Sequence, residues 1–357
     1  MKMRLPLCLS VFFAAALPVA LHAWAAPTHR AINQLALNSL PADFPAFVRD
    51  GVNAQRIVFL GTEPDRWRSS HSGPFRQIVD QEHDIDLEQL TAAGIDPTTV
   101  TPFLDDFIVQ FAAARAAHAD QFPPLEPERD YNHRYQLPGT LPWAVANDYG
   151  QLQELFSQWK TYRQYGTPAD VANTESLIVE LMGLMGHFVG DSSQPLHVTV
   201  HHHGWGGFGW KVSNPNGYTR RSSIHDWIDG GGAGGGFIGR AGITEKSLEP
   251  RVVPAQVLDT AVRPDGRSPI FVAIMNFVIG QNKEVEPLYR LEKEGKLKAD
   301  GTPGSLDGKP FIEEQILKGS QMLGSLWLTA WREAGPDVFL QSELVQRQAT
   351  KQAPPAP

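Results

Sequence analysis

Apolar residues recur every three to four positions along most long segments of this chain, which is the spacing of amphipathic helices. Leu177, Leu181 and Phe188 follow it in one segment, and Ile312 and Ile316 follow it in another. No run of alternating apolar and polar residues indicates a strand, so the sequence predicts a mainly α fold with little sheet. Further helices are predicted over residues 29–39, 102–121, 142–164 and 269–294.

Three segments depart from the helical pattern. Residues 204–221 mix glycines with aromatic residues, which predicts a small β-hairpin or loop insertion. Residues 230–239 are so rich in glycine that we expect a mobile loop. Residues 341–357 are polar and end in a proline-rich stretch, which predicts a disordered tail. We therefore expect a single helical domain over residues 24–340.

The N-terminal segment has the layout of a secretory signal peptide, with two basic residues, an apolar run over 5–20 and then small residues. We therefore predict removal of residues 1–23 and a periplasmic or secreted protein. A cut after residue 23 leaves Trp24 as the new N-terminus, whereas a cut before Ala26 agrees slightly better with the small residues expected at such sites. The sole cysteine, Cys8, lies in this segment, so the exported chain would contain neither thiol nor disulfide.

The charge balance of the chain limits its partners. The 357 residues carry a formal net charge of −8, which becomes −10 when Lys2 and Arg4 leave with the signal peptide. Such an acidic chain lacks the basic surface with which proteins bind duplex DNA. Binding of phosphate through metal ions remains compatible with this charge, and the sequence indicates no protein partner.

Histidines and aspartates occur together at spacings typical of metal ligands. His187 and Asp191 are four residues apart, and so are His225 and Asp229, which places each pair on one face of a helix. A proline after the first pair ends its helix and returns His197 toward the same place. Imidazole and carboxylate are the ligands expected for Zn²⁺ in a chain without thiolate. These residues together predict a metal site rather than isolated core histidines.

The segment from His187 to His197 reads His-Phe-x-Gly-Asp-x-x-Gln-Pro-Leu-His. It resembles the corresponding segment of the zinc-dependent S1/P1 nucleases, a family related to bacterial zinc phospholipase C. The resemblance implies a mainly α, single-domain fold of the phospholipase C/P1 nuclease type, and it covers most of the chain from residue 24 to about 334. The supporting matches, in the family's order, are Trp24 with His29, Pro64-Asp65, His83 to Asp86, and His225 to Asp229.

The resemblance further implies a cluster of three Zn²⁺ ions. A chelate through the amine of Trp24 would require this residue to be the N-terminus, which favours cleavage after residue 23 over cleavage before Ala26. The first ion would be held by Asp65, His83, His187 and Asp191, the second by His197, His225 and Asp229, and the third by His29, Asp191 and the amine and carbonyl oxygen of Trp24.

The same resemblance implies a reaction. In this family a hydroxide that bridges two zinc ions attacks the phosphorus atom, while the third zinc ion stabilises the leaving oxygen. Asp86 matches the family's aspartate that orients the attacking water, and we assign it that role. The implied protein is a secreted endonuclease that hydrolyses single-stranded RNA and DNA, with 3′-nucleotidase activity as a further activity that the family allows.

The chain also departs from the family pattern. The residue after His83 is Asp84, where the fungal members carry an aromatic residue that helps to hold a base, and the two glycines of the family's N-terminal motif are replaced. The run from His201 to His203 is expected to be a solvated loop, with a loose metal-binding tract as the alternative. Base and phosphate contacts are predicted instead from the 204–221 segment, with packing of its aromatic residues onto the domain as the alternative; the candidates are Trp205, Trp210, Lys211, Tyr218 and Arg220.

Two other functions are compatible with the same motifs. A phospholipase C would cleave phospholipid headgroups at a membrane with this cluster, and Asp84 is compatible with it. Asp229 favours the nuclease, because phospholipases of this kind carry glutamate there. A non-catalytic periplasmic zinc-binding protein would keep the ligands alone, and Asp86 favours an enzyme over it because no ligand role explains this residue.

Overall fold

The computed structural model describes residues 24–125, 128, 130, 133–207, 209–231 and 235–352. The predicted signal peptide, residues 1–23, and the end of the chain from residue 353 lie outside the described residues. Within the described ranges the chain is mainly helical and has no strand, which confirms the mainly α prediction. The described part of 204–221 is a loop, so the β-hairpin alternative is not confirmed.

The helices vary from one turn to seven in length, and the longest of them correspond to the segments with the clearest apolar spacing. In chain order they are α1 (Ala26–Ser39), α2 (Gly51–Leu60), α3 (Glu63–Trp67), α4 (Gly73–Glu82), α5 (Leu87–Ala92), α6 (Leu104–Ala117), α7 (Leu141–Tyr165), α8 (Pro168–Ser193), α9 (Ile224–Asp229), α10 (Gly236–Arg240), α11 (Glu245–Leu248), α12 (Pro269–Asn282), α13 (Val285–Lys293), α14 (Lys309–Glu333) and α15 (Val338–Gln352).

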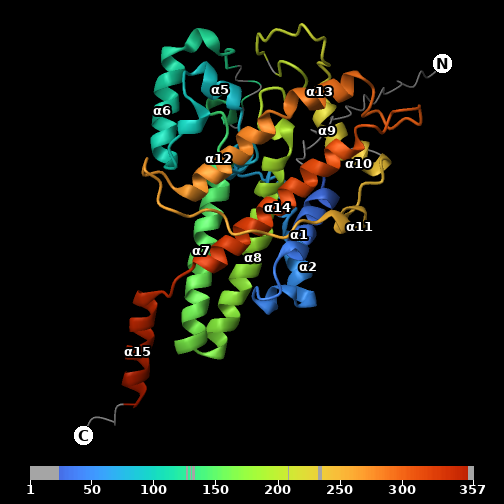
Figure 1. The fold of residues 1–357 in the computed structure, drawn as a ribbon. Coiled ribbons are helices and arrows are strands. Elements are labelled where there is room, and N and C mark those ends of the chain that lie inside the picture. The colour runs from blue at the N-terminus through green and yellow to red at the C-terminus, as the bar shows by residue number, and fades with distance from the viewer. Residues whose placement is uncertain are drawn as a thin grey trace, which may run out of the picture.

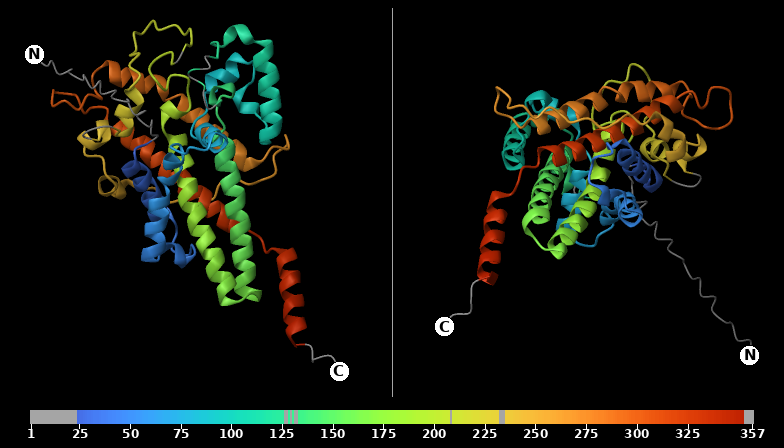
Figure 2. Two further views of the ribbon diagram at one scale, coloured as in Figure 1. Left: turned by 180° about the vertical axis from the view of Figure 1, so that it is seen from behind. Right: turned by 60° about the horizontal axis from the view of Figure 1, so that its bottom comes forward.

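Helices α7 and α8 form a long antiparallel pair, because only Gly166 and Thr167 separate them. Figure 1 shows α14 crossing this pair and α1 lying beside α8 and α14, and the reverse view in Figure 2 agrees. The side chains between these helices form the main apolar core, in which Ile32, Ile178 and Trp327 are completely buried. Burial of this apolar surface is what holds the long helices together.

The ends of α8 follow from its sequence. Thr167 accepts a hydrogen bond from the backbone of Asp170, whose carboxylate accepts one from the backbone of Thr167, and Pro168 occupies the first helical position. At the other end Gln194 is extended, as the residue before a proline tends to be, and Pro195 begins a short 3₁₀ turn. The predicted helix end at this proline is confirmed.

A second apolar core lies where α7 begins. It joins α5 and α6 to α12, which Figure 1 shows beside one another at this end of the molecule. Trp143 of α7 stacks on Phe107 of α6, with ring centroids 4.1 Å apart, and Phe271 of α12 packs against the same indole. Ile85 and Val198 belong to this core, so it fixes the two segments that carry His83 and His197.

Three predictions about segments need correction. The predicted helix over 269–294 is two helices, α12 and α13, and the glycine-rich segment 230–239 contains the start of α10. Residues 341–352 of the predicted disordered tail belong to α15, which lies against α7 (Figures 1 and 2). Leu344 of α15 is buried, and Gln341 and Gln348 donate hydrogen bonds to the hydroxyl and backbone oxygens of Tyr165, which explains why this polar segment is ordered.

No helix among the described residues combines the length and the apolar character that crossing a membrane requires.

Candidate metal centre

Helix α8 supplies the first ligand pair. His187 and Asp191 lie one turn apart on it, both are completely buried, and His187 Nε2 is 3.3 Å from Asp191 Oδ2. The other carboxylate oxygen of Asp191 lies 3.4 Å from Nε2 of His29 on α1. The four-residue spacing therefore places this pair on one face of the helix, as its sequence indicates.

Glycines on α8 allow α1 to approach this closely. A Cβ atom at Gly190 would lie 2.9 Å from Nδ1 of His29, and one at Gly186 would lie 1.8 Å from Oδ1 of Asn33. Asn33 donates from Nδ2 to the carbonyl oxygen of Gly183 at 3.0 Å, which ties α1 to α8. The missing side chains at these glycines thus let His29 reach the pair on α8.

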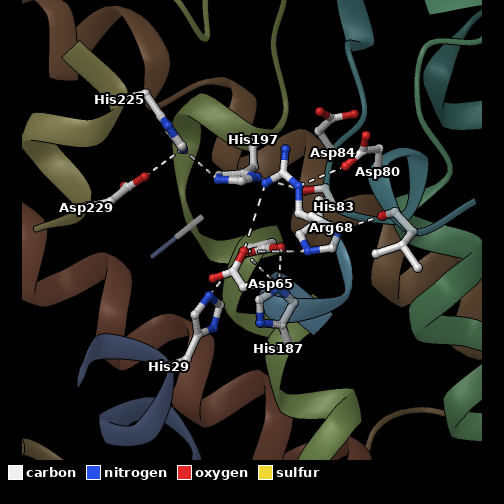
Figure 3. Close-up of polar contacts among 12 residues, drawn as sticks. His29, Asp65, Arg68, Asp80, His83, Asp84, His187, His197, His225 and Asp229 are labelled. Atoms are coloured by element: carbon white, nitrogen blue, oxygen red, sulfur yellow. Dashed lines mark hydrogen bonds and ion pairs between the residues drawn. The ribbon is translucent and has the colours of Figure 1, made fainter. Parts of the chain in front are cut away.

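Two further candidates come from separate segments. Asp65 lies on the short helix α3, His83 follows the end of α4, and both are buried. Asp65 Oδ1 is 3.7 Å from His83 Nε2 and 4.0 Å from His187 Nε2, and Figure 3 shows these side chains converging. Asp65, His83 and His187 form one group able to hold a metal ion, and His29, His187 and Asp191 form a second.

A third group lies on the other side of His83. His197 follows the turn at Pro195, and its Nε2 lies 2.8 Å from Nε2 of His225 on α9 (Figure 3). Asp229, one turn further along α9, places Oδ2 2.6 Å from the same nitrogen of His225. Gln194 donates a hydrogen bond to the second oxygen of Asp229. The predicted set of His197, His225 and Asp229 is therefore brought together in the buried interior.

His202 also belongs to this third group, although the sequence favoured a solvated loop for the run from His201 to His203. Its ring centroid lies 3.7 Å from that of His225 and 5.1 Å from that of His197. His197, His202 and His225 can together hold a metal ion. The run does form a loop, but His201 in it is buried, so the solvated-loop prediction is wrong for His201. His202 is partly buried and is the residue to which the metal-binding alternative applies, and the histidine run itself was the signal for it.

Hydrogen bonds orient the rings of the ligand candidates. Nδ1 of His83 lies 2.6 Å from the carbonyl oxygen of Val79, Nδ1 of His187 lies 2.9 Å from that of Gly61, and Nδ1 of His197 lies 2.7 Å from that of His83. A carbonyl oxygen only accepts, so each Nδ1 carries the proton. The lone pair of each imidazole is then on Nε2, which faces the cluster. Metal-binding histidines are oriented in this way.

Several buried polar atoms in the cluster lack hydrogen-bond partners. They are Oδ1 of Asp65, Nε2 of His83, Nε2 of His187 and both carboxylate oxygens of Asp191. Buried polar atoms without partners are rare and costly, so a set of them facing one another needs a physical explanation. Cations bound between them would satisfy all of these atoms, and the donor set therefore fits metal binding.

The pKa directions of His83 and His197 agree with this use of their side chains, whereas nearby aspartates, despite burial, raise the pKa of His187 and of His225. Burial, reinforced by the charge of Arg68, holds the pKa of His83 well below its ordinary value, and burial does the same for His197. Both imidazoles are therefore neutral near pH 7 and have a lone pair to donate. Burial raises the pKa of Asp191 to about 7. A divalent cation would oppose this effect, because it stabilises the ionised carboxylate.

Arg68 is a charged residue of the centre that sequence reasoning missed. Its Nε donates to Oδ1 of Asp80 at 3.0 Å, and one of its terminal nitrogens lies 3.9 Å from Oδ1 of Asp65. Figure 3 shows its guanidinium beside His83 and His197, between the two halves of the cluster. Its contact with Asp65 is a local pair three residues apart, whereas its hydrogen bond to Asp80 of α4 depends on the tertiary fold.

Trp24 is the first described residue, and its side chain is fixed against α8. The indole is completely buried, and its Nε1 donates to the carbonyl oxygen of Gly190 at 3.0 Å. The backbone nitrogen of Ala25 donates to the carbonyl oxygen of Asp229 at 3.0 Å. The start of the described chain therefore lies between the ligand segments of α8 and α9, and the role of Trp24 as a ligand stays a prediction.

A cavity of about 480 Å³ opens beside the third group. His202 and His203 line one part of it, and Asp86 and Trp210 line others. Gln89 donates a hydrogen bond of 2.7 Å to Oδ2 of Asp86, and burial together with the nearby charge of Asp84 raises the pKa of Asp86 to about 8. Asp86 belongs to none of the three metal-binding groups. Its assignment as the residue that orients the attacking water stays a prediction.

Asp84 also lines this cavity, but its charge is compensated. Arg134 donates a hydrogen bond to its Oδ2, and the two side chains form a largely buried ion pair across 50 residues of sequence. The ion pair offsets the repulsion of phosphate by Asp84 that the sequence suggests. Arg115 also lines the cavity, as do Asp86 and Asp130, so basic and acidic side chains share its wall.

The structure places the predicted substrate contacts in three kinds of position: lining the cavity, exposed away from it, or packed against the domain. Trp210 lines the cavity, whereas Lys211 and Arg220 are exposed and are not among the lining residues. Trp205 stacks on His201 at 4.0 Å between ring centroids, and Tyr218 is 6% exposed. These two aromatic residues pack the loop onto α13, so the packing alternative describes them better than substrate contact.

Comparisons of this chain with protein-family models, with characterised proteins and with solved structures give no match. The resemblance to the S1/P1 nucleases thus stays a prediction from the sequence motifs. The function is inferred below from the geometry of the metal centre.

Proposed function

We propose that this protein is a zinc-dependent phosphodiesterase that cleaves single-stranded RNA or DNA. The observation that carries this proposal is the position of the cavity, which adjoins the third histidine group and is lined by Asp86 and Trp210. Its volume of about 480 Å³ lies within the range of about 300–1,000 Å³ that is usual for small-molecule sites, and so suits one nucleotide unit.

The donor atoms favour zinc among the common metals. They are imidazole nitrogens and carboxylate oxygens without thiolate, in groups of three in which every residue but His202 is buried. One imidazole nitrogen binds one cation, so we assign His187 to the ion of Asp65 and His83. The two oxygens of Asp191 can serve two ions, so Asp191 would bridge to the ion of His29. Zinc in such a centre supplies Lewis acidity and an acidic water with a pKa of about 7.

The protein's own residues can bind the base and the phosphate of a substrate and orient the attacking water. Trp210 presents an aromatic face to the cavity, on which a nucleic acid base can stack. Arg68, held between Asp65 and Asp80, offers its remaining N–H groups to a phosphate oxygen at the cluster. In its ionised form, which its pKa of about 8 places in mildly alkaline solution, Asp86 can accept a hydrogen bond from the attacking water and so align it with the phosphorus atom.

The proposal is tested by metal content and cleavage on one preparation of the purified chain. We expect bound zinc, cleavage of a single-stranded oligonucleotide in preference to a duplex, loss of cleavage with a chelator, and recovery on addition of zinc. Release of phosphorylated headgroups from phosphatidylcholine vesicles without oligonucleotide cleavage would instead identify a phospholipase C. Zinc binding without either reaction would identify a non-catalytic zinc-binding protein.

A further inference from the structure

His202 has the orientation of a metal ligand. Its Nδ1 lies 2.8 Å from the carbonyl oxygen of Leu196, so Nδ1 carries the proton and Nε2 carries the lone pair. His197 is oriented in the same way by the carbonyl oxygen of His83. Nε2 of His202 therefore has the same chemical character as Nε2 of an expected ligand, and it lies within the same group.

The segment that carries His202 is held in place at several points. Glu88 accepts hydrogen bonds from the hydroxyl group of Thr199 at 2.7 Å and from the backbone of Val200 at 3.0 Å. Asn282 of α12 donates to the carbonyl oxygen of Val198 at 2.8 Å. On the far side Tyr289 of α13 donates to the backbone oxygen of residue 201. These hydrogen bonds fix the segment, so the position of His202 is determined by the fold.

We propose that His202 is a protein ligand of the ion held by His197, His225 and Asp229. This inference rests on the metal centre of the proposed function. It adds a third imidazole to the two histidines and one aspartate that the sequence motifs supply. The ion would be a borderline divalent cation such as Zn²⁺, for which imidazole is a preferred ligand.

A fourth protein ligand changes what this ion can do. Structural zinc sites have four protein ligands, whereas catalytic zinc sites keep a position open for water or substrate. With His202 bound, this ion is enclosed by protein donors on the side where His202 faces the cavity. It would therefore anchor the loop of 198–203 and exchange slowly, while its remaining side adjoins the other ligands of the cluster.

The first experiment compares the zinc-loaded wild type with His202→Ala and His203→Ala. His203 is the matched control, since it lines the same cavity beside His202 but is not in the third group. Zinc per chain and its release rate to a colorimetric chelator are measured. We expect His202→Ala to lose one slowly released ion, or to release it about tenfold faster or more, and His203→Ala to keep it.

A second measurement uses only the wild type, so it does not depend on the stability of a variant. The chain is labelled with ¹⁵N-histidine and loaded with ¹¹³Cd, and imidazoles coupled to cadmium are counted by NMR. Six coupled histidines are expected if His202 is a ligand, namely His29, His83, His187, His197, His202 and His225. Five, without His202, would overturn the inference.

The two proposals fail in different ways. A wild-type chain that takes up no zinc would overturn the metal centre, and the role of His202 with it. A wild type that binds zinc, together with a His202→Ala variant of equal zinc content and equal release rate, would overturn the role of His202 alone.

Discussion

At Gly186 there is no room for a methyl group. A Cβ atom there would lie 1.8 Å from Oδ1 of Asn33, whose side-chain nitrogen is held by the carbonyl oxygens of Ile57 and Gly183. Because Asn33 cannot turn away without losing these hydrogen bonds, Gly186→Ala should lower the free energy of unfolding by about 1–3 kcal/mol. Urea denaturation measures this change.

Gly150→Ala on α7 is the matched control for that substitution. Nothing lies within 4 Å of a Cβ atom at Gly150, and alanine is favoured over glycine inside a helix by roughly 0.5–1 kcal/mol. We expect this variant to be as stable as the wild type or slightly more so. If both substitutions change the free energy of unfolding equally, Gly186 is not needed for the close approach of α1 to α8.

The role assigned to Asp86 predicts a loss of turnover without a loss of metal. Asparagine keeps the size of the side chain and can still bond to Gln89, but it accepts a proton or a water hydrogen bond more weakly. Asp86→Asn should therefore reduce oligonucleotide cleavage by about 10²–10⁴-fold, the usual contribution of such a group. Zinc content, measured by mass spectrometry on the same sample, should stay at the wild-type value. Normal turnover would refute the role.

Among the helices, α7 and α4 bring two acidic groups together. Burial and the nearby charge of Glu82 raise the pKa of Asp148 to about 8, and burial raises that of Glu82 to about 7. The folded chain thus keeps a proton on Asp148 that the unfolded chain loses near the ordinary pKa of 3.8. At pH values between 3.8 and about 8, unfolding releases this proton. The free energy of unfolding therefore falls as the pH rises, by up to about 1.4 kcal/mol per pH unit.

Asp148→Asn should remove this contribution. We expect the variant to lose less stability than the wild type between pH 5 and pH 8, and to be the more stable of the two at pH 8. A residual slope below pH 7 should remain, because Glu82 is still buried. Thermal unfolding at each pH measures the effect, and Glu154→Gln, an exposed carboxyl on the same helix, is the control. Parallel curves for wild type and Asp148→Asn would contradict the prediction.

The long helices could be predicted from the sequence, because each has an apolar face with helical spacing and a clear end. Proline residues mark the first turn of α7, α8, α12 and α14, and Pro195 marks the end of α8. The short helices α3 and α9 are set by tertiary contacts instead. The order of α15 comes from its packing against α7, which the polar composition of residues 341–352 does not indicate.

The ligand candidates on α8 and α9 could also be predicted, because their four-residue spacing is a local signal. Arg134 could not, since its partner Asp84 lies 50 residues earlier in the chain. The run from His201 to His203 indicated a metal-binding tract only as an alternative, and it could not single out His202. Its distance to His225 depends on the return of the chain to α9, and only the fold supplies that distance.

At the scale of the whole molecule, bound metal should contribute to stability. The buried donors of three groups face one another near the centre of the fold, and they are costly without a cation. Binding of one ion at a thousand times its dissociation constant adds about 4 kcal/mol, and the melting temperature of a chain of this size changes by roughly 2–4 °C per kcal/mol. Chelation should therefore lower the melting temperature by at least about 10 °C, the amount expected from the loss of one ion.

Zinc should restore the melting temperature after chelation, whereas magnesium should not, because magnesium prefers oxygen donors and sheds its water reluctantly. Calorimetry of one sample before chelation, after it and after each addition makes the comparison. An unchanged melting temperature after complete removal of metal would mean that the cluster is stable without ions.

The position of α1 sets the order in which this centre can be completed during synthesis. His29 is made before His225 and Asp229, which follow about two hundred residues later, and α14, against which α1 packs, follows later still. At about 5–20 residues per second, a ribosome adds residues 29–229 in roughly 10–40 s. Until residue 191 is made, the early ligands lack a complete set of partners, and the packing of α1 against α14 has to wait longer still. Metal loading must therefore be a late step in the life of a newly made chain, and it can occur only in the compartment where the whole chain folds.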